Sequence, residues 1–116
     1  MQNIRSFYVK DNKQVYGTLS YAPDTKEFRL TIDHDIDILS APILISMFAD
    51  KGMYDLDAGW SLRWVKERII PPGRQNIREI LSANHMTEYD EFQMLLFTNG
   101  KCPQDDMWIE EIGERQ

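Results

Sequence analysis

The chain has 116 residues, of which 42% are hydrophobic and 11% aromatic, and its formal net charge is −6. This length and composition predict one globular domain, residues 1–116, with a modest core, and they exclude a disordered chain. The net negative charge argues against direct binding of nucleic acid, which requires clustered Lys and Arg.

The first third of the chain predicts an antiparallel β meander of three strands. Residues 4–10 and 14–21 are rich in Val, Tyr, Phe and Thr, and residues 11–13 between them have turn chemistry. A second turn at residues 22–25 leads to residues 27–32, where apolar and polar side chains alternate. That alternation predicts a strand with one buried face.

The rest of the chain predicts about three helices. Before them, residues 43–48 form an apolar segment that periodicity cannot assign to a strand or a helix. The first helix spans about residues 57–69, capped by Asp55 or Asp57 and ended by the two prolines at 71–72. The second spans about residues 74–83 and is expected to bury Ile77, Ile80 and Leu81. The third spans residues 87–98.

The third helix is predicted to open at Thr87, with Asp90 completing an acidic variant of the capping box, and to stop at Asn99-Gly100. Residues 107–112 could return to the sheet as a final edge strand. The expected fold class is therefore α+β, an antiparallel meander packed with C-terminal helices.

Cysteine content and hydropathy bear on the compartment. The single cysteine, Cys102, cannot form an intramolecular disulfide, which fits a reducing cytosol. Residues 1–10 lack the apolar core of a signal peptide, and the apolar stretch at 41–47 is too short to span a bilayer. We expect a cytoplasmic protein of bacterial type with no membrane partner.

Charge is distributed unevenly along the chain, with a basic segment between two acidic ones. Residues 60–78 contain five basic residues and one acid, whereas residues 33–59 and 79–116 are strongly acidic. Such a pattern favours a protein partner of complementary charge. The residues expected to contact that partner are Trp60, Arg63, Trp64, Arg68 and Arg74.

The two tryptophans of the first helix lie nearly opposite its apolar stripe of Leu62, Val65 and Ile69. They therefore either pack under residues 43–48 or form a surface anchor. Tryptophan and arginine are over-represented among the residues that dominate binding energy, which supports the second alternative.

The sequence indicates no catalytic, metal or cofactor site. Asp33, Asp35 and Asp37 alternate as in a calcium loop, but the glycine and the bidentate glutamate of such a loop are missing, so a solvated acidic loop is expected. The histidines and Cys102 have no zinc-ligand spacing. Cys102 lies beside Lys101, and a small enzyme would need one of the histidines as its base.

Four short motifs, in their order along the chain, resemble the N-terminal domain of the HipA-type serine/threonine kinase toxins. They also resemble the free-standing version of that domain, the small HipS-like protein of three-gene toxin–antitoxin systems. The similarity runs from Val15 to Cys102, and its weight lies in order and spacing. The motifs are Gly17-Thr18-Leu19-Ser20-Tyr21, Ile43-Leu44-Ile45-Ser46-Met47, Ile70-Pro71-Pro72-Gly73-Arg74, and Asp90 to Leu96 followed by Gly100 and Cys102.

The chain departs from the family pattern at two places. Pro72, Arg74 and Lys101 stand where the family usually has acidic residues. After Cys102 the family continues into a kinase domain, whereas this chain ends at Gln116. The resemblance therefore implies a protein without the ATP-binding lysine and catalytic aspartate of a kinase, which either neutralises or completes a kinase encoded separately.

The sequence thus predicts a non-catalytic regulatory or antitoxin-like subunit that binds and controls a HipA-like kinase, and that could meet a DNA-binding antitoxin through that complex. Two other hypotheses remain open. One is an acidic protein-binding module that acts on host or phage machinery by imitating nucleic acid. The other is a small enzyme that uses Cys102.

Overall fold

The structure is a computed structural model, and it describes residues 4–112. Four strands form one antiparallel sheet in the order β3-β2-β1-β4. The α+β class is confirmed, and so is the final strand. This strand pairs with β1, the first strand of the meander, and not with β3, the last. The strands are β1 (Arg5–Lys10), β2 (Val15–Ala22), β3 (Glu27–Ile32) and β4 (Trp108–Glu111).

Four α-helices and one short 3₁₀ helix accompany the sheet. The segment that periodicity left open is helical and forms α1. Each of the three helices predicted after it is present but shorter than expected. Within residues 4–112 no helix has both the length and the hydropathy to cross a membrane. The helices are η1 (Ile38–Ser40), α1 (Ile43–Asp50), α2 (Ala58–Lys66), α3 (Ile77–Ala83) and α4 (Glu91–Thr98).

Aspartate side chains cap the starts of α2 and α4. The Asp57 carboxylate accepts from the Trp60 N–H (2.9 Å) at the start of α2, as one of the two predicted caps. For α4 the prediction was wrong: the cap is Asp90, whose carboxylate accepts from the Gln93 N–H, and Thr87 lies outside the helix. Asp90 has extended backbone angles, so the chain cannot be helical from residue 87 through this point.

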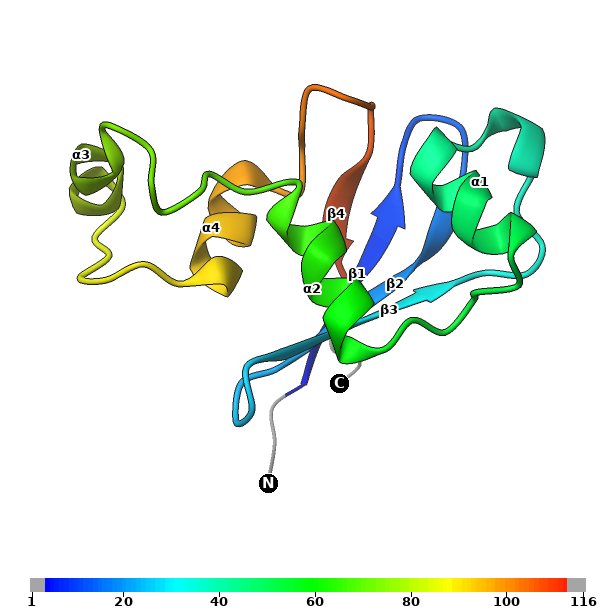
Figure 1. The fold of residues 1–116 in the computed structure, drawn as a ribbon, viewed down its shortest axis with the longest axis horizontal. Helices are drawn as coiled ribbons and strands as arrows, with labels where there is room; N and C mark the ends of the chain where they lie inside the picture. The colour runs from blue at the N-terminus through cyan, green and yellow to red at the C-terminus, as the bar shows by residue number, and fades with distance from the viewer. Residues whose placement is uncertain (1–3, 113–116) are drawn as a thin grey trace.

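The start of α3 and the burial of its side chains also differ from the prediction. Residues 71–76 form successive turns, in which the Arg74 N–H donates to the Pro71 carbonyl and the Ile77 N–H donates to that of Arg74. The helix therefore starts at Ile77. Its three apolar residues are half-buried, because α3 lies at the far end of the molecule, beyond α4 and away from the sheet (Figure 1).

One face of the sheet forms the core. Phe28, Leu30 and Ile32 alternate along β3 and are buried, as the period of two predicted. The Phe92 ring of α4 stacks on the Tyr21 ring of β2 at 4.0 Å between centroids. In Figure 1, α2 crosses the front of this sheet, while η1 and α1 lie at one end, beside the turn between β1 and β2. The helices therefore cover one face of the sheet. At the end near the β1–β2 turn, η1 and α1 lie beside that turn.

The buried side of α2 is wider than the apolar stripe that the sequence indicates. Val65 and Ile69 of that stripe are buried and Leu62 is half-buried, while Ser61, Trp64 and Arg68 are buried beside them. The Ser61 hydroxyl accepts from the buried Leu30 N–H at 2.8 Å, which satisfies a β3 backbone group. Two polar residues thus occupy core positions at helical spacing.

Candidate functional site

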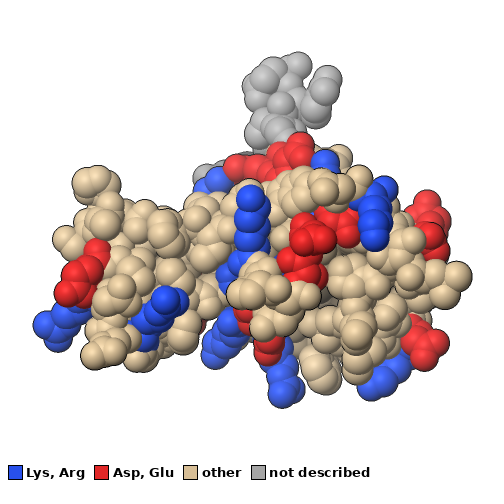
Figure 2. Space-filling model, turned by 90° about the horizontal axis from the view of Figure 1, so that it is seen from above, with Lys and Arg blue, Asp and Glu red and all other residues tan. Residues whose placement is uncertain are grey.

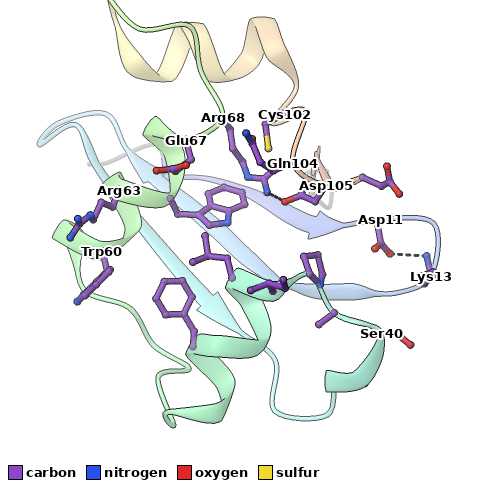
Figure 3. Close-up of a pocket in the computed structure, with 17 residues that line it drawn as sticks. Asp11, Lys13, Ser40, Trp60, Arg63, Glu67, Arg68, Cys102, Gln104 and Asp105 are labelled. Carbon is purple, nitrogen blue, oxygen red and sulfur yellow. Dashed lines mark hydrogen bonds and ion pairs between the residues drawn. The ribbon is translucent and has the colours of Figure 1, made fainter.

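A cavity of about 750 Å³ lies between α1, α2 and the segment 102–106. The turn between β1 and β2 closes one end, and residues 40–44 form the wall opposite the 102–106 segment. Figure 3 shows Trp60 and Arg63 at one side, Arg68 with Gln104 and Asp105 at another, and Asp11 with Lys13 near the β1–β2 turn. The size falls in the range of ligand sites in proteins. The lining residues are Asp11, Lys13, Ser40, Ala41, Pro42, Ile43, Leu44, Phe48, Trp60, Arg63, Trp64, Glu67, Arg68, Cys102, Gln104, Asp105 and Asp106.

Trp64 and Arg68 line the cavity and are its most buried polar or aromatic residues on the α2 side, with 2% and 3% of their surface exposed. The Arg68 guanidinium lies over the Trp64 ring, with its carbon 4.6 Å from the ring centroid. It donates to the Gly100 carbonyl (2.8 Å) and to the Asp105 carboxylate, which pairs it electrostatically. Two buried donors, Trp64 Nε1 and Arg68 Nε, have no hydrogen-bond partner among the residues that the structure describes.

The outer wall on α2 consists of Trp60 and Arg63. The Trp60 indole is 40% exposed, packs edge-on against Phe48, and lies under the Arg63 guanidinium, whose carbon is 5.1 Å from its ring centroid. An aromatic ring held by a cation and a second ring offers an ordered contact surface at low entropic cost. Trp60 and Arg63 are therefore accessible from outside, unlike Trp64 and Arg68.

The hydrogen-bonded turn between β1 and β2 positions Asp11, which lines one end of the cavity. Asp11 accepts from the Tyr16 hydroxyl (2.5 Å) and from the backbone N–H groups of Lys13 (2.8 Å) and Gln14 (3.2 Å). Burial opposes ionisation of Asp11, but these hydrogen bonds outweigh it and lower the pKa of the carboxyl group. Burial, together with the Asp11 carboxylate, raises the pKa of Tyr16 to about 12. The Asp11 carboxylate thus serves to hold the turn in place.

Apolar surface continues outward from the cavity over η1 and α1. We define the apolar rim as Leu39, Ile43, Met47 and Trp60, which are 97%, 78%, 47% and 40% exposed. Ile43 and Met47 are one helical turn apart on α1, and Ile43 and Trp60 both line the cavity. Groups of large exposed apolar side chains on a soluble domain mark interaction sites more often than single ones do.

The structure brings together four of the five residues that the sequence predicts to contact a partner. Trp60, Arg63, Trp64 and Arg68 all line the cavity, whereas Arg74 is exposed in the turns between α2 and α3 and does not. The two tryptophans do not share one environment, because one is buried and the other half-exposed. Trp64 and Arg68 line the cavity but are almost completely buried, so they offer a partner far less surface than Trp60 does.

Sequence reasoning missed the other walls of the cavity. The residues at 11–13, 40–44 and 102–106 are distant in sequence and meet only through the strand order and the packing of α1. The signals available were indirect: Pro42 preceding an apolar run, and two adjacent acids, Asp105 and Asp106, following Cys102.

The other candidate groups lie elsewhere or alone. Cys102 lines the cavity, but neither histidine does: His34 stacks on Tyr54, and His85 follows α3 in a left-handed backbone conformation. Asp37 caps η1 by accepting from the Leu39 N–H. Among residues 4–112, no group of three or more His, Cys, Asp or Glu side chains could hold a metal ion.

Comparison of the chain with protein-family models, curated proteins and solved structures finds no match.

Proposed function

We propose that this protein is a non-catalytic regulatory subunit that binds a separately encoded HipA-like serine/threonine kinase and controls its activity. The observation that supports this best is the apolar rim, in which four large side chains remain 40% to 97% exposed beside one cavity. Exposure of this extent costs free energy in the isolated domain. Burial against a partner would recover it.

The composition of the surface fits a protein partner. Trp60 and Arg63, the residue types that most often dominate interface energy, adjoin the rim. In Figure 2, Lys and Arg side chains lie beside Asp and Glu side chains over the middle of the face shown. Exposed apolar side chains and charges of both signs therefore occur together on the surface, as they do in protein–protein interfaces.

The test is co-expression with a HipA-like kinase, followed by co-purification, binding calorimetry and a phosphorylation assay. Ile43→Glu places a charge in the apolar rim and should weaken binding about tenfold or more. Phe97→Glu makes the same change at a 49% exposed apolar residue of α4, outside the cavity, and should bind as the natural chain does. The absence of any complex with the natural chain, or equal losses for both variants, would refute the proposal.

A nucleic-acid mimic receives less support from the same surface. Such a mimic needs acidic side chains spaced densely over one face, and the cavity lining contains Lys13, Arg63 and Arg68 in addition to its acids. Competition with duplex DNA for a DNA-binding enzyme separates the two functions, because only the mimic would displace DNA.

A further inference from the structure

Two side chains of opposite charge mark the two ends of the apolar rim. At one end, the Asp37 carboxylate accepts from the Leu39 N–H at 3.2 Å, so an acid adjoins the most exposed apolar side chain of the rim. At the other end, the carbon of the Arg63 guanidinium lies 5.1 Å from the centroid of the Trp60 ring. The rim therefore has an acidic end beside η1 and a basic end on α2.

The middle of the rim lies on α1 and is apolar. In Figure 3, α1 lies between Trp60 of α2 and Ser40 of η1, and Figure 1 shows the same order of elements. Ile43 and Met47, one turn apart on α1, are 78% and 47% exposed. Neighbouring residues keep the sign of each end, because residues 33–40 contain three acids and no Lys or Arg, while α2 contains two bases and no acid.

Both terminal charges can pair with a partner. Asp37 and Arg63 are exposed, and neither forms an ion pair with another of residues 4–112. An occupant that complements the rim needs an apolar centre, a base opposite Asp37 and an acid opposite Arg63. The rim of a second copy, turned by 180°, presents this arrangement, because a two-fold axis places residue i opposite j and j opposite i.

We propose that a second copy of this chain covers the apolar rim in a two-fold dimer. Ile43 and Met47 lie near the axis and pack against the same residues of the other copy. Leu39 of each copy contacts Trp60 of the other, and Asp37 of each copy pairs with Arg63 of the other. Four large side chains from each copy make a small interface, which is typical of weak dimers.

The dimer and the kinase complex use the same surface. The proposed function places the kinase on the apolar rim, so the kinase must displace the second copy before it can bind. Self-association therefore covers the rim while no kinase is present and lowers the concentration of the form that binds. This exchange rests on the proposed function, whereas the dimer rests on the rim alone.

The first test measures self-association of the full chain by sedimentation velocity from about 1 μM to about 500 μM, a range that covers small, weak interfaces. We expect a monomer–dimer equilibrium without larger species. Ile43→Glu places two like charges near the axis and should weaken the dimer at least about tenfold. Phe97→Glu makes the same change outside the rim and should leave the dimer unchanged. A natural chain that stays monomeric, oligomers that grow without limit, or full dimerisation of Ile43→Glu would overturn the inference.

The second test examines the register with a double-variant cycle. Arg63→Glu places an acid opposite Asp37 in both halves of the interface and should weaken the dimer about tenfold. Asp37→Asn removes the charge but keeps an oxygen that can accept from the Leu39 N–H. Adding Asp37→Asn to Arg63→Glu should therefore strengthen the dimer about threefold or more, because the introduced acid then faces a neutral amide. Losses that add in the double variant would overturn the inference.

The third test adds a HipA-like kinase to the chain at a concentration where the natural chain is mostly dimeric. The kinase should dissociate the dimer and form a complex with one copy of this chain. A chain that dimerises through the rim and binds no kinase would refute the proposed function and leave the dimer supported. A kinase that binds a chain that never dimerises would overturn the inference and leave the proposed function standing. Binding of the kinase to the intact dimer would overturn the exchange.

Discussion

Loss of the Asp105 carboxylate should destabilise the domain far more than loss of its partner, Arg68. The Arg68 guanidinium is 3% exposed and donates to Asp105 and to the Gly100 carbonyl. Asp105→Ala leaves this buried cation with one neutral acceptor. Arg68→Met removes the buried charge itself and its unpartnered Nε, and it leaves a carboxylate that is 15% exposed and still accepts from the Met107 N–H (3.0 Å).

The magnitude follows from the cost of an uncompensated buried charge. Removing one partner of a buried ion pair costs about 3–5 kcal/mol, and the partial exposure of Asp105 places Asp105→Ala at about 3 kcal/mol. Arg68→Met should cost less, about 1 kcal/mol, because the carboxylate that it leaves is 15% exposed and keeps the hydrogen bond from the Met107 N–H. The double variant should resemble Arg68→Met, since neither variant retains the buried guanidinium cation.

Urea unfolding followed by tryptophan fluorescence measures these differences. With a slope of about 1.5 kcal/mol per M for a domain of this size, the midpoint should fall by about 2 M for Asp105→Ala and by less than about 1 M for Arg68→Met. The slopes themselves should not change. An Asp105→Ala variant that is as stable as Arg68→Met, or a double variant less stable than either, would refute the view that a buried charge dominates this site.

Three further predictions concern the sheet and the turn beside the cavity. Gly17→Ala should cost more than about 3 kcal/mol or prevent folding, because a Cβ there would lie 2.0 Å from a β3 carbonyl oxygen; Gly73→Ala, whose Cβ meets nothing within 4 Å, should be neutral in the same thermal melts. Ser61→Ala should cost about 1–3 kcal/mol in urea unfolding, because it leaves a buried β3 N–H unpaired; a neutral result would contradict the role of this hydroxyl. Because the pKa of Tyr16 is raised to about 12 from 10.0, the stability that its neutral hydroxyl provides through Asp11 is complete below pH of about 10 and is lost as pH rises toward 12. The stability difference between the natural chain and Tyr16→Phe should therefore shrink over that window, and a constant difference would contradict the assignment.

Local sequence signals were sufficient for most of the secondary structure. The alternation in β3 predicted its bounds, because a strand with one buried face requires a period of two. Asp57 and the Asn99-Gly100 pair marked a helix start and a helix end, because capping depends on side chains within a few residues. Thr87 failed as a cap because Asp90 competes for the same role and lies closer to the apolar run.

The apolar stripe of the first predicted helix marked Val65 and Ile69, which are buried, but only tertiary packing extended the buried side of α2 beyond them. The buried side includes Ser61 and Arg68, which are polar and would be expected at the surface from sequence alone. Each forms a hydrogen bond with a residue distant in sequence: Ser61 accepts from the Leu30 N–H, and Arg68 donates to the Asp105 carboxylate. The same long-range pairing places Trp64 in the cavity wall and leaves Trp60 half-exposed. The sequence by itself determined the elements and the fold class, because these depend on neighbouring residues. The cavity exists only through the meeting of the β1–β2 turn, α1, α2 and the 102–106 segment, which no local pattern encodes.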